Sequence, residues 1–353
     1  MKKQFLAGVL GAAMVLGSLT GCGSKPAESA AAPAETTAAA KDTTAADTAA
    51  PADTKAEEPA AEAAGGEEIV IGCTLQNLSE EFMTMLQGAM ELQLKNYDNV
   101  KLIINDAESQ SDKQASQLDS FVAQGVDAVI ISPVDADALA SAVKTVVDAG
   151  IPVVTCSADV TGDQGQIWVG SSNENGGEIE MKYVAEQLGG KGKIAVLRGP
   201  LGAFAEQGRF AGYEAALKDY PDIEIVFDQT GNWQREEAMA LIENLITTGT
   251  ELDAIVCQND GMALGALEAV KAAGKKDQIT ITGIDAIVDA LDSIKAGELD
   301  ATCFQDAIGQ GTNALDMAIK AAKGEKIERM DIPFELVTKD NVDGYYDRIK
   351  LPE

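Results

Sequence analysis

The side chains best suited to chemistry in this chain are carboxylates, amides and aromatic rings that stand directly after short apolar runs. Asp159 follows one such run, and Asp285 follows another at Ile279–Gly283. Carboxylates and amides form paired hydrogen bonds with neighbouring hydroxyl groups, and an aromatic ring can cover an apolar face of a small molecule. The 353 residues include no histidine, so histidine triads, histidine general bases and histidine metal sites are excluded.

Two successive sets of strands and helices must position these side chains. The predicted strands are Ile69–Cys73, Val100–Ile104, Ala128–Ile131, Pro152–Cys156 and Ile167–Val169, then Lys193–Leu197, Ile223–Phe227, Ala254–Cys257, Ile279–Gly283 and Ala301–Phe304. The predicted helices are Glu81–Leu94, Ser111–Gln124 and Ala136–Asp148, then Glu206–Lys218, Gln234–Thr247, Gly261–Ala272 and Ile287–Ala296. Short apolar strands that alternate with amphipathic helices are typical of parallel sheets covered on both faces. The sequence therefore predicts an α/β protein with two similar doubly wound lobes.

Ligands of open α/β sheets bind beyond the carboxyl ends of the strands. The segments at these places are Thr74–Phe82, Ser132–Asp135, Ser157–Asp159, Pro200–Arg209, Gln229–Trp233, Gln258–Gly261, Gly283–Ala286 and the region around Gln305. No strand is followed by a glycine-rich phosphate loop, and the cysteine spacings match no metal motif. We therefore expect neither a cofactor nor a metal.

The N-terminus has the features of a lipoprotein export signal. Lys2 and Lys3 precede an apolar run at Phe5–Leu19, and its length of about 15 residues suits a signal peptide better than a membrane span. The sequence Leu-Thr-Gly that precedes Cys22 looks like a lipobox, so we predict a signal peptide at 1–21 and a lipid anchor on Cys22. Residues 22–67 are rich in Ala, Thr, Pro and acidic residues, which predicts a disordered tether.

The net charge and the remaining cysteines limit the possible functional classes of the protein further. The formal net charge of −30 excludes nucleic-acid binding as the main function, because that function depends on Lys and Arg. Cys73, Cys156, Cys257 and Cys303 each lie in an apolar strand-like run. We interpret them as small core residues with reduced thiols, and disulfides are the alternative for an exported protein.

The strand-end segments resemble the ribose-binding-protein branch of the type I periplasmic binding proteins. Five segments carry the resemblance: Asp127-Ala-Val-Ile-Ile-Ser-Pro133, Gly150-Ile-Pro-Val-Val154, Arg209-Phe-Ala-Gly-Tyr213, Gln258-Asn-Asp-Gly-Met-Ala-Leu-Gly-Ala266 and Thr282-Gly-Ile-Asp285. They follow the family order across about residues 68 to 340. The resemblance implies a first lobe at 68–172 plus 306–333, a second lobe at 173–305 plus 334–340, and a C-terminal tail at 341–353.

Eight ligand-binding residues follow from the resemblance. They are two rings, Phe82 and Trp233, three polar contacts, Asn259, Asp285 and Gln305, and three further positions, Asp159, Gln207 and Arg209. Core packing is the alternative for the rings, and helix capping is the alternative for Asn259 and Asp285. A solvated strand end is the alternative for Gln305. The family has an Asp-Arg pair where this chain has Ser157-Ala158-Asp159, and an Arg where it has Gln207. The loss of two guanidinium groups disfavours ribose.

The resemblance implies a solute-binding lipoprotein outside the cytoplasm that is not an enzyme. It would bind a small neutral sugar, namely a hexose, polyol or pentose, between its lobes and deliver it to an ABC permease. We expect it to be a monomer. One alternative is a sensor subunit that presents the ligand to a membrane receptor. The other is a glycosidase that uses two of the acids Asp135, Asp159 and Asp285.

The lipid anchor can be tested by replacing Cys22 with Ser. We expect Cys22→Ser to release the protein from membranes, because a serine hydroxyl does not take the diacylglyceryl group. Fractionation of cells that express each form, followed by mass spectrometry, measures this. Continued membrane pelleting of an unmodified Cys22→Ser protein would contradict the prediction.

Overall fold

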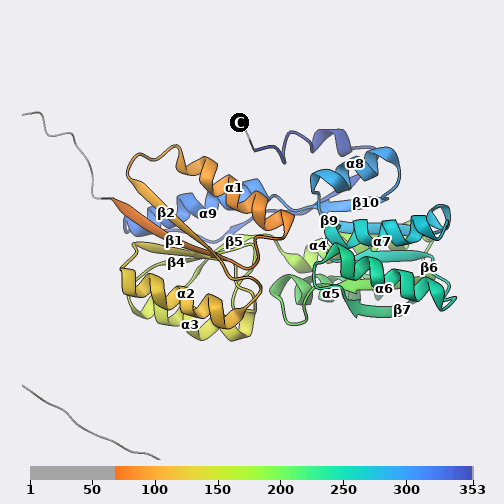
Figure 1. The fold of residues 1–353 in the computed structure, drawn as a ribbon, viewed down its shortest axis with the longest axis horizontal. Coiled ribbons are helices and arrows are strands. Elements are labelled where there is room, and N and C mark those ends of the chain that lie inside the picture. The colour runs from red at the N-terminus through yellow and green to blue at the C-terminus, as the bar shows by residue number, and fades with distance from the viewer. Residues whose placement is uncertain (1–67, 352–353) are drawn as a thin grey trace, which may run out of the picture. The chain divides into compact units, whose positions relative to one another are not determined.

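The computed structural model describes residues 68–351, and these contain two six-stranded sheets (Figure 1). The predicted signal peptide, Cys22 and the predicted tether lie outside the described residues. We refer to the elements that share the first sheet as the first lobe, and to those that share the second sheet as the second lobe.

The first sheet is parallel throughout, in the order β11-β5-β4-β3-β1-β2. Its strands are β1 (Ile69–Leu75), β2 (Val100–Asp106), β3 (Ala128–Ile131), β4 (Val153–Cys156), β5 (Ile167–Gly170) and β11 (Met330–Asp331). Every residue of β3 and β4 is buried. Helices cover both faces of these central strands, so neither face is exposed to solvent and the strands need no alternation of polar and apolar residues.

The second sheet repeats this plan in the order β12-β10-β9-β8-β6-β7. Its strands are β6 (Lys191–Arg198), β7 (Asp222–Thr230), β8 (Ala254–Cys257), β9 (Thr280–Asp285), β10 (Ala301–Phe304) and β12 (Glu335–Thr338). All neighbours are parallel except β12, which runs antiparallel to β10. The prediction of two doubly wound α/β lobes is confirmed.

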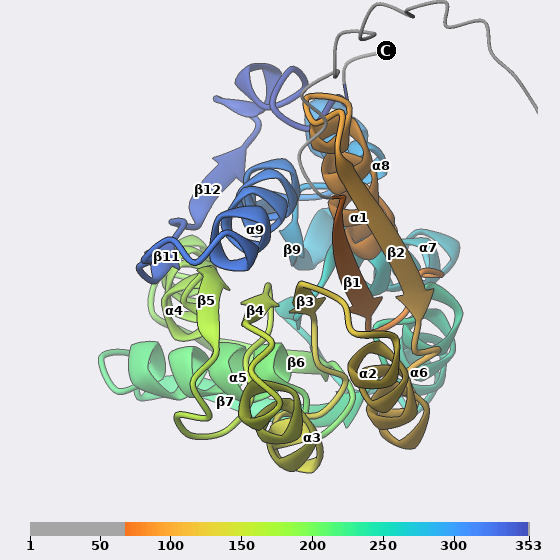
Figure 2. The same cartoon turned by 90° about the vertical axis from the view of Figure 1, so that its left-hand side faces the viewer.

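Helices cover both faces of each sheet (Figures 1 and 2). In the first lobe, α1 (Glu81–Leu94) and α9 (Ala307–Ala322) pack on one face, and α2 (Ser111–Gln124) and α3 (Ala136–Asp148) pack on the other. In the second lobe, α4 (Asn173–Gln187) and α5 (Phe204–Leu217) pack on one face, and α6 (Arg235–Thr247), α7 (Asp260–Ala272) and α8 (Val288–Ala296) pack on the other. Two short 3-10 helices, Lys276–Gln278 and Val342–Gly344, complete the described elements.

The four cysteines of this part of the chain are buried in these cores and form no disulfide with one another. Burial raises the pKa of the Cys73 thiol well above its usual range, so the thiol stays protonated. The structure therefore supports the interpretation as small core residues rather than the disulfide alternative.

The sequence analysis predicted no helix at α4 or α9, and both helices contain glycines at close helix contacts. Glycine has a low helix propensity, and α4 contains Gly176 and Gly177, while α9 contains Gly309 and Gly311. A Cβ atom on Gly177 would lie 2.1 Å from the carbonyl oxygen of Arg209 in α5. A Cβ atom on Gly311 would lie 2.5 Å from the carbonyl oxygen of Leu86 in α1. The residues that weaken the local helix signal are therefore those that allow two helix pairs to pack closely.

The chain passes from one sheet to the other three times in the described residues. The passages lie between β5 and β6, between β10 and β11, and between β11 and β12. The lobe boundaries that the resemblance implies remain a prediction. The C-terminal segment after β12 packs into the second lobe, because Val342, Tyr345 and Ile349 are buried in its core.

We expect the close packing of α4 against α5 to be sensitive to one methyl group. A Cβ atom on Gly212 would lie 2.1 Å from the carbonyl oxygen of Glu174. This oxygen belongs to the backbone of a helix, so it cannot move away as the end of a flexible side chain can. Gly212→Ala should lower the free energy of unfolding by about 1–3 kcal/mol or more. Urea denaturation measures it. Gly344→Ala is the matched control, because no atom lies within 4 Å of the added methyl group, and equal stability of both variants would contradict this packing.

Candidate functional site

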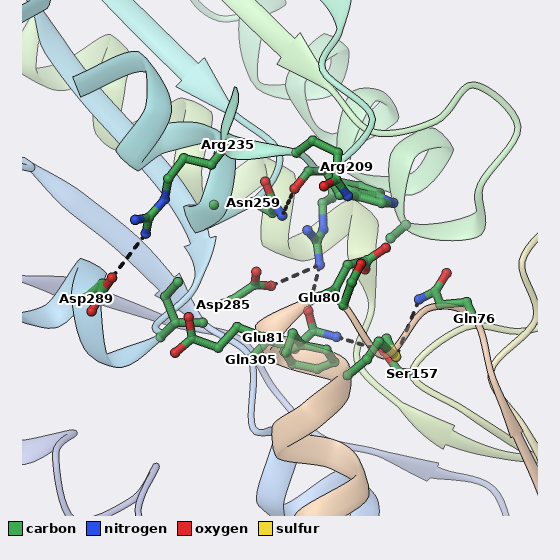
Figure 3. A pocket seen from close by; sticks show the side chains of 18 of the residues that line it. Gln76, Glu80, Glu81, Ser157, Arg209, Arg235, Asn259, Asp285, Asp289 and Gln305 are labelled. Carbon is green, nitrogen blue, oxygen red and sulfur yellow. Dashed lines mark hydrogen bonds and ion pairs between the residues drawn. The ribbon is translucent and has the colours of Figure 1, made fainter. Parts of the chain in front are cut away.

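A cavity of about 410 Å³ lies at the carboxyl ends of strands from both lobes (Figure 3). The first lobe lines it with the loop after β1, the start of α1 and Ser157 after β4. The second lobe lines it with the starts of α5, α6 and α7 and with the loops that follow β9 and β10. The polar and aromatic lining residues are Gln76, Ser79, Glu80, Glu81, Phe82, Ser157, Arg209, Trp233, Gln234, Arg235, Glu236, Asn259, Asp285, Asp289 and Gln305.

Most of the ligand-binding residues that the sequence predicts come together in this cavity. Those that line it are Phe82, Arg209, Trp233, Asn259, Asp285 and Gln305. They belong to both lobes and are up to 223 positions apart in the chain, from Phe82 to Gln305. The carboxyl ends of parallel strands meet at one edge of each sheet, which explains this convergence.

Two predicted residues, Asp159 and Gln207, do not line the cavity. A carboxylate oxygen of Asp159 accepts a hydrogen bond from Gln166 Nε2 at 3.0 Å, so it orders its own loop. Gln207 is exposed and donates from Nε2 to the carbonyl oxygen of Gly202 at 3.0 Å. The first turn of α5 holds this side chain beside the preceding loop rather than in the cavity. Both predicted ligand contacts therefore lie outside this cavity.

Backbone geometry fixes the position of the Trp233 ring. Asn232 and Trp233 both have left-handed backbone conformations, with φ of 52° and 63°, which costs energy for residues other than glycine. The carbonyl oxygen of Trp233 accepts a hydrogen bond from Asn259 Nδ2 at 3.2 Å. A Cβ atom on Gly199 would lie 2.0 Å from the indole ring, so only glycine lets the ring lie there. Asn259 also caps α7, since its Oδ1 accepts from the Met262 N–H at 3.0 Å.

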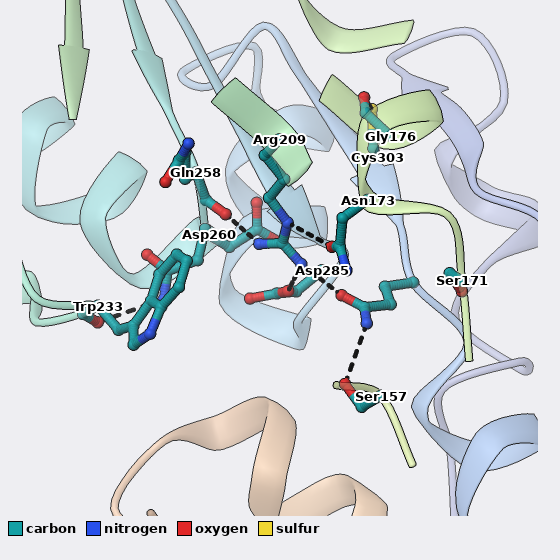
Figure 4. Close-up of polar contacts among 12 residues, drawn as sticks. Ser157, Ser171, Asn173, Gly176, Arg209, Trp233, Gln258, Asp260, Asp285 and Cys303 are labelled. Atoms are coloured by element: carbon teal, nitrogen blue, oxygen red, sulfur yellow. Dashed lines mark hydrogen bonds and ion pairs between the residues drawn. The ribbon is translucent and has the colours of Figure 1, made fainter. Parts of the chain in front are cut away.

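A buried guanidinium group organises the floor of the cavity (Figure 4). Arg209 Nε donates to Asn173 Oδ1 at 3.1 Å, and Nη2 donates to Gln305 Oε1 at 2.6 Å. Nη1 donates to the carbonyl oxygen of Gln258, and Nη2 lies 3.9 Å from an oxygen of Asp285. Gln305 Nε2 then donates to Ser157 Oγ of the first lobe at 3.3 Å. Arg209 thus acts mainly by positioning Gln305 and Asp285.

The carboxyl groups of Asp285, Asp260 and Glu80 have raised pKa values. Burial raises the pKa of Asp285 well above its usual range, Arg209 opposes this shift, and Asp260 and Glu80 add to it. Burial likewise raises the pKa of Asp260 to about 6, although Thr302 Oγ1 donates to its carboxylate at 2.7 Å. Burial also raises the pKa of Glu80 to about 8. These groups share one buried cation, Arg209.

Several lining residues were missed as individual ligand contacts by the sequence analysis. Gln76, Glu80 and Glu81 lie within the strand-end segment Thr74–Phe82, but nothing in the sequence separates them from ordinary residues at a helix start. Arg235 and Asp289 also line the cavity and pair with each other at 3.2 Å. The position of Glu80 after a strand was the sequence signal that it could line the cavity. The places of Arg235 and Asp289 beside the cavity follow instead from the packing of α6 and α8.

Two further features of the described residues bear on function. Residues 68–351 contain no group of three or more Cys, Asp or Glu side chains placed to hold a metal ion. In the same part of the chain, every helix is too short or too polar to cross a membrane.

Comparison with known proteins decides the family. A model of the periplasmic binding protein domain matches residues 71–326, which is more than half of the chain. The chain belongs to the periplasmic binding protein family. This result confirms the family resemblance inferred from the five sequence segments.

The binding protein is similar to several relatives over most of its length. It is 42% identical over 280 residues to a protein of Rhizobium meliloti named for rhizopine binding, covering 77% of this chain and 91% of the relative. It is 34% identical over 275 residues to the ribose import binding protein RbsB of Bacillus subtilis, covering 77% and 88%. A crystal structure of an ABC transporter solute binding protein from Bacillus halodurans with bound myo-inositol is 40% identical, with a TM-score of 0.78, covering 80% and 98%.

These two relatives are a ribose import binding protein and a solute binding protein of an ABC transporter with a bound polyol. The members of the family are substrate-binding transport proteins, and they are located outside the cytoplasm.

We expect the Arg209 contacts to dominate the stability of the binding protein's second lobe. Arg209→Leu would leave acceptors on Asn173, Gln258 and Gln305 without their donor in a buried place. Breaking a buried charged network in this way costs about 3–5 kcal/mol. Urea denaturation measures the change.

Arg235→Gln is the matched control for that experiment. Its ion pair with Asp289 is partly exposed, and such pairs contribute at most about 1 kcal/mol. Equal destabilisation by the two substitutions would contradict the role assigned to Arg209.

Proposed function

We propose that this protein is a lipid-anchored, monomeric binding protein that captures an uncharged cyclic polyol or hexose and delivers it to an ABC permease. The observation that carries the proposal is the cavity itself, which two rings and several hydrogen-bonding groups from both lobes line. Its volume of about 410 Å³ lies within the 300–1,000 Å³ that is common for small-molecule sites. The similar solute binding protein with bound myo-inositol supports the choice of ligand class.

The lining suits hydroxyl groups better than anionic groups. Asp285, Asn259 and Gln305 offer acceptors and donors for neighbouring hydroxyls, and the rings of Phe82 and Trp233 can cover apolar C–H faces. A phosphate or a carboxylate needs free cationic donors. The guanidinium of Arg209 is already bonded to protein acceptors, so it leaves little capacity for such a ligand.

Ligand contacts to both lobes explain how the protein can signal to a permease that a ligand is bound. A ligand that touches both walls stabilises the closed arrangement of the lobes, because some of its contacts exist only there. We infer that the permease recognises this closed form and that no covalent step takes place. The acids considered for a glycosidase do not come together in the cavity, since Asp135 caps α3 by accepting from the Asp137 N–H at 2.9 Å, and Asp159 orders its own loop.

Ligand binding by wild type and variants tests the proposal. We expect myo-inositol to bind more tightly than ribose in isothermal titration calorimetry. Asp285→Ala and Trp233→Ala should each weaken binding at least about tenfold, because an unpaired hydroxyl or a lost ring contact costs about 1–3 kcal/mol. The ligand should be recovered unchanged after incubation with the protein.

Gln207→Ala is the matched control and should bind like wild type, because Gln207 lies outside the cavity. Thermal melting of each variant separates lost binding from lost folding. Wild-type affinity in both Asp285→Ala and Trp233→Ala would refute the cavity as the site. Tighter binding of ribose or of a sugar phosphate would refute the ligand class.

A further inference from the structure

The residues that follow β12 form a short segment that belongs to neither sheet, and we call residues 341–351 the C-terminal strap. Val342, Tyr345 and Ile349 of the strap are buried in the core of the second lobe. No residue of the strap lines the cavity. Any effect of the strap on a ligand must therefore pass through the elements that the strap contacts.

Two polar contacts hold the strap on α8 of the second lobe. Lys295 Nζ lies 2.7 Å from an oxygen of Asp343, and the hydroxyl group of Tyr346 donates to Asp292 Oδ1 at 2.7 Å. The first turn of α8 includes Asp289, which lines the cavity. The strap is thus fixed to a helix that forms part of the cavity wall in the second lobe.

Arg348 fixes the strap to two strands that lie next to the crossings between the lobes. Its two terminal nitrogens donate to the two carboxylate oxygens of Glu335 in β12, each at 2.8 Å. Its guanidinium group also lies over the ring of Phe304, the last residue of β10, at 4.2 Å from the ring centre. Two parallel hydrogen bonds and a stacked ring hold this end of the strap more firmly than a single surface ion pair would.

Leu351, at the end of the strap, contacts the first lobe. A Cβ atom on Gly88 of α1 would lie 2.3 Å from Leu351 Cδ1, so the leucine lies against the bare backbone of that helix. Met85, one turn earlier in α1, packs against the cores of both lobes. Figure 1 shows the strap running from α8 toward α1. The strap therefore bridges the lobes at a place other than the three chain crossings.

The spacing of the two anchors makes this bridge short. Ile349 is buried in the second lobe and Leu351 contacts α1, so Lys350 alone separates them. Two residues of fully extended chain span at most about 7 Å. The first turn of α1 lines the cavity with Phe82, opposite the wall to which α8 belongs. Moving α1 away from α8 beyond the reach of the strap must break the contact of Leu351 or expose Ile349.

We propose that the C-terminal strap is a tether between the lobes that restricts opening of the cavity and so slows release of the ligand. The inference rests on the proposed function where it concerns ligand release, whereas the restriction of opening does not depend on which ligand binds. Two observations carry it. Arg348 holds the strap on the second lobe, and Leu351 then packs on a helix of the opposite lobe.

The substitution Leu351→Ala tests the tether, because it removes most of the contact with α1 and leaves the buried anchors in place. We expect the ligand-free variant to have a larger radius of gyration than ligand-free wild type in small-angle X-ray scattering. With myo-inositol as the probe, the dissociation rate in stopped-flow tryptophan fluorescence should rise about fivefold, as expected for the partial loss of one leucine contact.

Lys350→Ala is the matched control. Lys350 lies between the two anchors, and its Nζ pairs with Asp347 at 3.3 Å, where both side chains are largely exposed. This variant should match wild type in radius of gyration and in dissociation rate. Thermal melting of every variant separates a loosened tether from a general loss of stability.

A pair of cysteines tests the tether in the opposite direction. Gly88→Cys combined with Leu351→Cys places two thiols at the contact, whereas the four natural cysteines of the described residues are buried. Oxidation should join the new pair as a disulfide. The joined protein should release myo-inositol more slowly than wild type, and a reducing agent should reverse this effect.

The outcomes distinguish the tether from the proposed function. Wild-type radius and wild-type release rate in Leu351→Ala would overturn the tether, and so would either change without the other. A correctly folded cysteine pair that does not oxidise would overturn the contact itself. If myo-inositol binds no form of the protein, the proposed ligand fails, while the radius of gyration of the ligand-free forms still decides whether the strap restricts opening.

Discussion

The buried guanidinium of Arg209 is the constraint on which the site depends. A charge removed from water must be paired and hydrogen-bonded, and the planar fork of arginine fixes the directions of its partners. Asn173 stands at the start of α4, and Gln305 follows β10, so the partners lie where the chain passes between lobes. The contact from Gln305 to Ser157 extends the network to the first lobe. One side chain therefore holds ligand-facing groups and interlobe connections in a single arrangement.

The electrostatic character of the second lobe follows from the same residue. Arg209 lowers the pKa of Glu180, Asp260 and Asp285, but burial acts more strongly in the opposite direction on each of them. Glu180 reaches a pKa of about 8 even though Tyr213 and Thr282 both donate to its carboxylate. A single cation cannot compensate several desolvated acids.

Helix packing explains how Arg209 comes to lie at that place. It belongs to α5, and its carbonyl oxygen approaches Gly177 of α4 so closely that no side chain fits between them. This approach brings the guanidinium within hydrogen-bonding distance of Asn173, the first residue of α4. The glycines that make α4 difficult to predict are thus part of the same construction as the site. The Trp233 ring depends on a comparable contact, because it lies against Gly199.

The amino-acid sequence by itself determined the alternation of strands and helices, the two α/β lobes and the family. Those features depend on local apolar periodicity and on contiguous motifs, such as the segment from Gln258 to Ala266. The family resemblance of the sequence also indicated Phe82, Trp233 and Asp285 as ligand-binding residues, and all three line the cavity.

Only the tertiary structure decided which polar groups remain free to meet a ligand. It turned Asp159 and Gln207 toward their own loops and assigned Arg209 to protein acceptors. It also revealed α4 and α9, whose glycines oppose helix formation locally but permit close packing. The physical reason is that a side chain's hydrogen-bond partners and burial come from elements distant in the chain, about which local sequence carries no information.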